Sequence, residues 1–387
     1  MREKRWIVSV TAALCVVMTS FAAPAEAESD GTWDYVSYSV SGVYFPIVGN
    51  FAGDKASDIY WYAPGAGVDT MYVGNEGSRT FDKVRIPMDE VATPIVGDFA
   101  GDDYDDIFWY RAGTAVDRLW VSEDTDDIFD TSITKSVSGT YQPKVLRDWR
   151  AEGKDRIFWY RPGDGTDPLW IFDEDGSHRS ISQQIRSNLQ VIAGDWNGDL
   201  VEDLFLYGPG SLPDRVWISH AGPFTSTKVT INGSYEAVPV IGDEYDDVLL
   251  YGSGTKPDRY LQNLGGHFRI LTTFLPARGY GYSFGMGGAV VYSPADRENA
   301  LWTDGDSVIT TYLSDTRDVG SNKVYGQGDF DGDGFMDILW YGPGTGSDAV
   351  WYWDAGGDAG DAAARSAEGA APTTGTVKSG VPTASRD

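Results

Sequence analysis

Short apolar runs separated by clusters of Gly, Asp, Ser and Pro recur along the chain, and the period of an amphipathic helix is missing from the repeat region. In one stretch the pattern predicts strands at residues 94–96, 106–110, 118–122 and 131–136. Residues 107–110 are apolar at every position, whereas a strand with one solvated face would alternate. The pattern therefore predicts sheets that are covered on both faces.

This stretch belongs to a unit that occurs seven times. Each unit ends its second strand with a tyrosine, has Asp or Asn seven residues later, and has a large side chain three residues after that. The tyrosines are Tyr62, Tyr110, Tyr160, Tyr207, Tyr251, Tyr292 and Tyr341; the residues that follow are Asp69, Asp117, Asp167, Asp214, Asp258, Asn299 and Asp348, and then Tyr72, Trp120, Trp170, Trp217, Leu261, Trp302 and Trp351. The units vary from 41 to 50 residues in length, so a tight hairpin is held constant while outer loops vary.

These units predict an all-β fold, a seven-bladed β-propeller of four-stranded blades. The last unit has only three strands, and residues 39–42 duplicate the sequence at 136–139. We therefore expect residues 32–42 to supply the missing strand, so that the N-terminal strand completes the last blade and covers its exposed edge. The alternatives, a linear solenoid or two separate β domains, would not need a repeat that is split between the two ends of the chain.

Two loops between first and second strands carry oxygen donors at the spacing of a calcium site. Positions 1, 3, 5 and 9 supply side-chain oxygens and position 7 a backbone carbonyl, while glycine allows the bend. The predicted ligands are Asp195, Asn197, Asp199, Val201 and Asp203 in the fourth unit, and Asp329, Asp331, Asp333, Phe335 and Asp337 in the seventh. Weaker sites are predicted from Asn50, Asp54 and Asp58 and from Asp98, Asp102 and Asp106, because alanine replaces the third-position donor there. The alternative interpretation of such loops is an ordinary acidic turn.

The order of a short strand, a Gly-Asp-Phe or Gly-Asp-Trp opening, a DxDGDGxxD-type loop and an apolar strand resembles the FG-GAP/VCBS repeat. This repeat forms integrin α-subunit propellers and occurs in many secreted bacterial proteins. The resemblance covers about residues 33–354 and implies a seven-bladed fold with Ca2+ in the loops that join first and second strands. It does not identify a ligand, because the family includes adhesins, lectins and non-catalytic modules of enzymes.

The N-terminus has the order of an export signal, with basic residues, an apolar run and an Ala-Glu-Ala site. We expect residues 1–27 to be removed, residues 28–354 to form the propeller, and the Gly/Ala/Ser/Thr-rich residues 355–387 to be a disordered tail. The protein is thus predicted to be secreted and extracellular, with no membrane insertion after cleavage. The single cysteine, Cys15, lies in the segment to be removed, which excludes disulfides and thiol chemistry in the mature chain.

The formal net charge of −28 at pH 7 argues against nucleic acid as a partner, since an acidic surface repels phosphate. An extracellular glycan or protein is the expected partner of a monomeric protein. The face opposite the calcium loops would carry the ligand candidates Tyr44, Arg111, Tyr141, Arg161, Tyr235, Arg278, Tyr280 and Tyr282. Alternatively, these tyrosines pack the edges of blades. We expect the recurrent Asp to cap its own turn and the Trp three residues later to pack between blades.

No catalytic residue is predicted. The histidines His178, His220 and His267 are far apart in sequence, and residues 281–285 match the GxSxG string without the strand-to-helix turn that this chemistry needs. The leading hypothesis is a calcium-binding, non-catalytic binding or adhesion module. The alternatives are a polysaccharide-degrading enzyme, either a lyase or a glycosidase, and a purely structural secreted protein.

Overall fold

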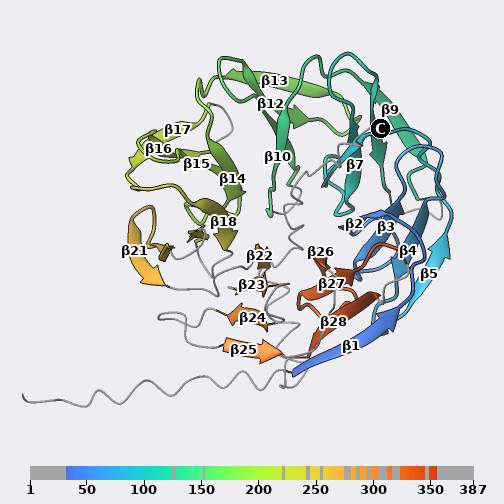
Figure 1. Cartoon of the computed structure of the whole chain (residues 1–387). Coiled ribbons are helices and arrows are strands. Elements are labelled where there is room, and N and C mark those ends of the chain that lie inside the picture. The colour runs from blue at the N-terminus through green and yellow to red at the C-terminus, as the bar shows by residue number, and fades with distance from the viewer. Residues whose placement is uncertain are drawn as a thin grey trace, which may run out of the picture.

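The computed structural model describes residues 32–123, 128–150, 153–219, 223–240, 245–252, 256–273, 280–284, 288–293, 298–303, 312–315, 323–344 and 348–354. Strands are the regular elements of these residues, and they form four-stranded antiparallel sheets that stand around a common centre (Figure 1). The predicted signal segment 1–27 and tail 355–387 lie outside the described residues. No helix in the described ranges is both long enough and apolar enough to span a bilayer.

The sheets follow the order of the chain, apart from the one that contains both ends. Three sheets consist of β2 (Phe45–Gly49), β3 (Asp58–Tyr62), β4 (Thr70–Gly74) and β5 (Phe81–Val84); β6 (Thr93–Gly97), β7 (Asp106–Tyr110), β8 (Asp117–Val121) and β9 (Thr131–Lys135); and β10 (Gln142–Leu146), β11 (Arg156–Tyr160), β12 (Asp167–Phe172) and β13 (His178–Gln183). Three more consist of β14 (Gln190–Gly194), β15 (Asp203–Tyr207), β16 (Asp214–Ile218) and β17 (Thr225–Val229); β18 (Glu236–Val240), β19 (Asp247–Tyr251), β20 (Asp258–Asn263) and β21 (Phe268–Thr273); and β22 (Tyr280–Phe284), β23 (Gly288–Ser293), β24 (Glu298–Thr303) and β25 (Tyr312–Asp315). The remaining sheet contains β26 (Lys323–Gly328), β27 (Asp337–Tyr341), β28 (Asp348–Asp354) and β1 (Thr32–Tyr38).

The second strand of a sheet is buried along its whole length. Every residue of β3, β7, β11, β15 and β27 is buried, as expected for an apolar strand between two neighbouring sheets. The outer strands are more exposed; β17, for example, is exposed at four of its five residues. The sequence prediction of sheets covered on both faces is thus confirmed for these strands.

Buried side chains form cores between neighbouring sheets. One core joins the β26–β28 sheet to the β2–β5 sheet through Trp61 and Tyr341. Further cores join the β2–β5, β6–β9, β10–β13, β14–β17 and β18–β21 sheets in that order. Each of these six sheets therefore packs face to face with a neighbour, as the blades of a propeller do.

The packing corrects the sequence prediction of seven blades. Described side chains pack six sheets into blades. For β22–β25 the structure describes the backbone pairings and the position of β22 beside β18, and no side chains. The structure thus supports an all-β propeller with six packed blades of four strands. The prediction of seven included the unit with Tyr292 and Asn299, whose side chains the structure does not describe, so the described packing supports six blades.

The N-terminal strand completes the last blade. β1 pairs antiparallel with β28 from Thr32 opposite Asp354 to Tyr38 opposite Asp348. Beyond the strand, the Val40 amide donates to Asp348 Oδ2 at 2.8 Å, and Gly42 forms a bridge with Gly344. The predicted pairing of the two ends of the chain is confirmed, and the edge of β28 is covered.

The recurrent aspartate of each hairpin joins two segments. Asp69 Oδ1 accepts a hydrogen bond from the Ala63 amide and Oδ2 accepts one from the Met88 amide, both at 2.6 Å. The same pair of bonds recurs at Asp117, Asp167, Asp214 and Asp348. The predicted turn cap is confirmed, and the second oxygen also fixes the connector to the next blade.

The strand-end tyrosine fastens the same connector. The Tyr62 hydroxyl donates to the Glu90 carbonyl at 2.6 Å and accepts from the Ala92 amide at 3.0 Å. Equivalent pairs of bonds are made by Tyr110, Tyr160, Tyr207 and Tyr341. The conserved spacing of Tyr and Asp within the repeat therefore builds the junctions between blades.

Candidate functional site

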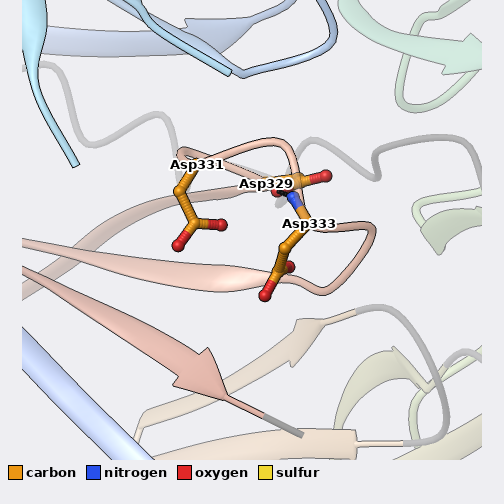
Figure 2. A group of neighbouring side chains, drawn as sticks. All are labelled: Asp329, Asp331 and Asp333. Atoms are coloured by element: carbon orange, nitrogen blue, oxygen red, sulfur yellow. Dashed lines mark hydrogen bonds between the residues drawn. The ribbon is translucent and has the colours of Figure 1, made fainter. Parts of the chain in front are cut away.

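The loop between β26 and β27 gathers three carboxylates. One oxygen from each of Asp329, Asp331 and Asp333 lies within 4.8 Å of the others, and Figure 2 shows the three side chains around the turn. Asp331 is 7% exposed, and its Oδ1 is buried without a hydrogen-bond partner. Carboxylate oxygens that converge in this way are the ligands that a hard divalent cation prefers.

Asp337, the predicted ninth-position ligand, has a different set of partners. Its carboxylate is fully buried and accepts hydrogen bonds from the amides of Phe330 at 2.8 Å and Trp353 at 3.0 Å. Asp58 accepts three such amides in its own blade, from Phe51, Ala52 and Gly74. The group of three therefore does not include Asp337, and the ninth-position aspartates fasten the loop to the sheet.

Asp329 is held by the backbone of its loop. It accepts hydrogen bonds from the amides of Asp333 at 3.0 Å and Gly334 at 2.8 Å. Burial, together with the charges of Asp333 and Asp331, raises the pKa of Asp329 to about 7. A bound cation would offset this repulsion and favour the ionised carboxylate.

One cation of the protein already contacts this loop. Arg79 Nε donates to Asp331 Oδ2 at 3.0 Å, while its Nη1 donates to Asp34 Oδ2 at 2.9 Å. The guanidinium also lies over the Tyr352 ring, 4.6 Å from the centroid. Arg79 thus ties the loop of the last blade to the closing strand β1 and leaves Asp331 Oδ1 available.

The predicted site in the fourth unit has the same fold of the loop with fewer charges. Asp195 Oδ1 accepts from the amides of Asn197, Gly198 and Asp199, and Oδ2 accepts from Leu200 at 2.8 Å. The Asn197 side chain donates to Asp199 Oδ2 at 3.1 Å. Val201 is buried and lies at the end of the loop, where it bridges Asp148.

The weaker predicted sites differ from one another. Asp98 holds the amides of Gly101, Asp102 and Asp103, and burial raises its pKa to about 6. Asp106 is buried, and its carboxylate accepts hydrogen bonds from the backbone amides of Phe99, Ala100 and Ser122. In the first blade Asp54 accepts from Ala56 and Glu76, while Asn50 donates its side-chain amide to the Asp103 carbonyl.

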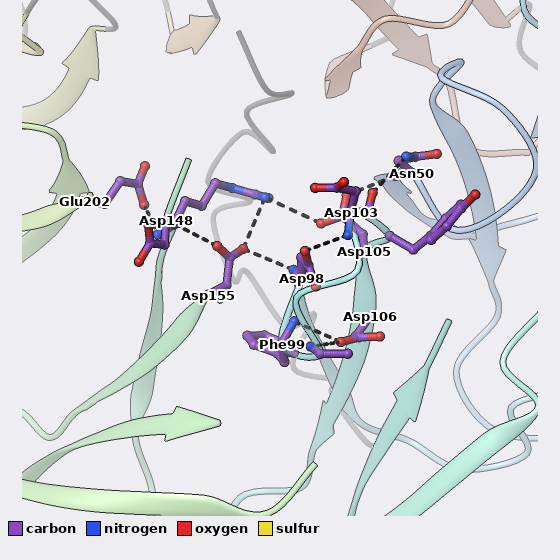
Figure 3. Close-up of polar contacts among 12 residues, drawn as sticks. Asn50, Asp98, Phe99, Asp103, Asp105, Asp106, Asp148, Asp155 and Glu202 are labelled. Atoms are coloured by element: carbon purple, nitrogen blue, oxygen red, sulfur yellow. Dashed lines mark hydrogen bonds and ion pairs between the residues drawn. The ribbon is translucent and has the colours of Figure 1, made fainter. Parts of the chain in front are cut away.

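A row of acidic side chains links these loops to one another. In each case the carboxylate accepts a hydrogen bond from the backbone N–H of the first loop residue of the preceding blade. The pairs are Asp105 with Asn50, Asp155 with Asp98, Glu202 with Arg147, and Asp246 with Asp195. Figure 3 shows Asn50 beside Asp105, and Asp98 beside Asp155. Arg147 lies 3.5 Å from Asp105 and 3.4 Å from Asp155, and all three side chains are buried. Sequence reasoning missed this row, although an acidic residue recurs just before the second strand of these blades.

The predicted ligand face contains tyrosines that pack. Tyr235 is 7% exposed within a core, and Tyr44 and Tyr141 contact Trp61 and Trp159 edge to face at 6.1 and 6.0 Å. These contacts agree with the alternative interpretation that the three tyrosines pack the edges of blades, and their role in ligand contact stays a prediction.

Of the remaining predicted ligand residues, Arg111 donates to the Glu90 carboxylate, and Arg161 is exposed. Arg278 lies outside the described residues, and for Tyr280 and Tyr282 the structure gives the backbone of β22 only.

A cavity of about 210 Å3 lies where sequence reasoning placed no ligand residue. It is formed by the connector between β13 and β14 and by strands β15 to β17; its lining is Gln184, Ile185, Ser187, Leu189, Leu206, Pro213, Arg215, Trp217 and Ser226. Polar and apolar groups meet in this cavity, as they do in small-ligand sites. No repeated motif marks it, because it arises where the connector departs from the repeat.

The candidate catalytic features lie in ordinary structural positions. Ser283 of the GxSxG string lies within β22, paired with Ala289, so it is not on a strand-to-helix turn. His178 stacks on Trp170 at a centroid distance of 3.6 Å. His267 lies in the turn before β21, and His220 falls outside the described residues.

Comparisons with known proteins give structural similarity alone. No family model matches the chain, and no curated protein matches it. Similar solved structures include a chain of the Photorhabdus luminescens Tc holotoxin pore, at 11% identity and a TM-score of 0.44, with 84% of this chain and 14% of that chain covered. This chain therefore spans a small part of that toxin chain.

Two further similar structures are single propeller domains. The WD40 domain of Toxoplasma gondii coronin has 11% identity and a TM-score of 0.48, with 84% of this chain and 87% of that chain covered. The β-propeller domain of the Trilobed protease from Pyrococcus furiosus has 13% identity and a TM-score of 0.48, with 83% and 98% covered. The sheet order of the chain itself defines it as a β-propeller, while the FG-GAP/VCBS resemblance stays a prediction.

Proposed function

We propose that the protein is a secreted, calcium-binding β-propeller that acts as a non-catalytic binding module for an extracellular glycan or protein. The observation that carries the calcium part is the convergence of Asp329, Asp331 and Asp333 within 4.8 Å. The donor set fits the ion, because all three side chains offer carboxylate oxygens and Asp331 Oδ1 is buried without a partner. Bound Ca2+ would cross-link the loop and neutralise its repulsion.

Calorimetric titration of Ca2+ into the chelator-treated full chain tests this site. The informative variant is Asp333→Asn, because Asp333 is exposed and an asparagine oxygen can still accept the Phe335 amide. We expect saturable binding in the unmodified protein and one bound Ca2+ fewer in the variant. Asp164→Asn is the matched control, since Asp164 is an exposed carboxylate in the turn after β11. An unchanged isotherm for Asp333→Asn would place the ion elsewhere.

The binding role is supported by a rigid scaffold that carries a cavity of mixed polarity. Loops and connectors on such a scaffold are the usual location of ligand contacts. A glycan array and a pull-down from extracellular material, each with and without chelator, test this role. Saturable binding to a glycan or protein is expected, and silence in both assays would leave a structural role. Release of reducing or unsaturated ends from polysaccharides would instead favour the alternative of a glycan-cleaving enzyme.

A further inference from the structure

The cavity beside Ser187 and Arg215 differs from the equivalent junctions of the other blades. Among the described connectors, four have a residue whose carbonyl accepts the hydroxyl of the strand-end tyrosine that precedes them in the chain: Glu90, Gly139, Ser187 and Gly233. Two residues later, the connector amide returns a hydrogen bond to the same hydroxyl. These shared bonds fix the equivalence of the positions and allow the junctions to be compared residue by residue.

At the junction of the β2–β5 and β6–β9 blades, a carboxylate of the protein occupies this place. The Glu90 side chain lies 3.5 Å from Arg118 Nη2 and also accepts a hydrogen bond from Arg111. Arg118 directly follows the recurrent aspartate of its blade. The arginine at this repeat position is therefore neutralised from within the chain.

At the junction of the β14–β17 and β18–β21 blades, an aromatic ring occupies the place. Arg259 has the same repeat position as Arg118, and its guanidinium lies 5.4 Å from the centroid of the Tyr235 ring. Lys256 also lies over this ring, at 3.7 Å. Here the connector offers a tyrosine two residues after Gly233, and the cationic side chains pack on it.

At the junction of the β10–β13 and β14–β17 blades, neither partner is present. Ser187 stands where Glu90 stands, and Leu189 stands where Tyr235 stands. The described contact of Arg215 is a hydrogen bond to Ser226 Oγ at 3.3 Å, and no carboxylate of the described chain pairs with it. The cavity of about 210 Å3 is lined by Ser187, Leu189 and Arg215, the residues at the repeat positions that bring Glu90 or Tyr235 beside an arginine at the other two junctions.

We propose that this cavity binds the carboxylate-bearing sugar of an acidic saccharide, with the ligand carboxylate on Arg215 in the place that Glu90 takes beside Arg118. The inference rests on the proposed role as an extracellular binding module and assigns its site and ligand class. A guanidinium pairs with a carboxylate through two parallel hydrogen bonds, which gives both affinity and orientation.

The other walls favour a sugar as the carrier of that carboxylate. Ser187, Ser226 and Gln184 offer hydroxyl and amide groups for ligand hydroxyls, while Trp217 and Pro213 offer an apolar surface. The volume corresponds to about seven water molecules at the density of the liquid. This space suits a single sugar ring better than several residues of an acidic peptide. Arg215 presents a positive charge to the cavity of a chain whose net charge is −28, and this charge favours an anionic ligand.

The test uses the full chain and pairs of oligosaccharides that differ only in a uronate or the matching neutral sugar. We expect the unmodified protein to bind the uronate members and Arg215→Gln to weaken that binding at least about tenfold, as for the loss of a charged hydrogen bond. Ser187→Glu should abolish binding, because it supplies the internal carboxylate that Glu90 supplies at the equivalent junction. Arg118→Gln is the matched control and should leave binding unchanged. A thermal melt of each variant confirms folding.

Several results would overturn the inference. Equal affinity for uronate and neutral members, unchanged binding in Ser187→Glu, or binding of poly-glutamate in place of the saccharides would each do so. If the protein binds other glycans and these variants have no effect, the site is wrong while the proposed function stands. If the unmodified protein binds no glycan and no protein at all, the proposed binding function fails together with the site.

Discussion

The calcium-type loops differ in the residue at their sixth position, where the backbone can take a positive φ angle. The sixth loop residue has a positive φ in three of the described loops: 90° at Gly334, 64° at Leu200 and 70° at Asp103. Glycine adopts this conformation freely, whereas a leucine is strained there by about 1–2 kcal/mol. Among these three loops, the loop of the last blade is therefore the one with a glycine at the strained position.

Replacing Leu200 should relieve this strain. We expect Leu200→Gly to raise the free energy of unfolding by about 0.5 kcal/mol. The relief of backbone strain is larger than this, but glycine also increases the conformational entropy of the unfolded chain, which offsets part of it. Urea denaturation measures the difference. The reciprocal variant Gly334→Leu should lose about 1–2 kcal/mol, and a stable Gly334→Leu protein would refute the assignment of strain.

The sequence revealed the recurrent side chains but not their partners. Tyr62 and Asp69 were recognised from their constant spacing, and the turn-capping role of Asp69 followed from its chemistry. Their second partners are backbone amides of the connectors, such as Ala92 and Met88, which leave no signature in the sequence. The cavity at Arg215 was missed for the same reason, since a departure from a repeat has no pattern of its own.

At the scale of elements, the predicted strands lie close to the observed ones. The predicted 131–136 strand corresponds to β9 (Thr131–Lys135), and the predicted 118–122 strand is shifted by one residue from β8 (Asp117–Val121). Short apolar runs and the turn residues between them define where these strands occur, because apolar runs are the segments that become buried. The pairing of β1 with β28 was also predictable, because a repeat was split between the ends of the chain.

Arg79 is expected to stabilise the junction between β1 and the β26–β27 loop. In chelator, Arg79→Gln should lower the free energy of unfolding by about 1–2 kcal/mol, since Asp331 loses its charged partner near two other carboxylates. Urea denaturation at constant pH gives the value. Arg85→Gln is the control, because Arg85 is an exposed arginine of the same blade. Equal effects of the two variants would show that only the net charge matters.

For the molecule as a whole, the number of sequence repeats exceeds the number of blades that the described packing supports. The sequence predicts seven blades, whereas the cores of the described side chains join six. Sequence repeats report common ancestry of segments, whereas a blade needs buried side chains on both faces. Closure by β1 joins the two ends of the described chain and could be predicted, because the split repeat marks both partners in the sequence.

Buried carboxyl groups should make the metal-free protein less stable as the pH rises. Burial raises the pKa of Asp58 to about 8 and that of Asp155 to about 7, against an unfolded value of about 3.9. Between about pH 4 and pH 8 the native state thus holds more protons than the unfolded state, so the free energy of unfolding falls with rising pH. Melting in chelator from pH 5 to pH 8 should show a falling Tm.

High salt provides the control for this pH dependence. In 1 M NaCl the repulsion between surface carboxylates is screened over about 3 Å, whereas burial of Asp58 and Asp155 is unaffected. The fall of Tm with pH should therefore persist in high salt. A flat profile in high salt would assign the effect to the net charge of −28 instead.

We propose that Ca2+ binds the folded propeller at the carboxylates of the last loop and stabilises it. The most direct measurement is the Tm of the full chain after removal of metal by chelator and again after return of millimolar Ca2+. Ligand that binds only the native state raises its stability by mass action, so Tm should rise by several degrees and this rise should shrink in Asp333→Asn. An identical Tm with and without Ca2+ would contradict the account.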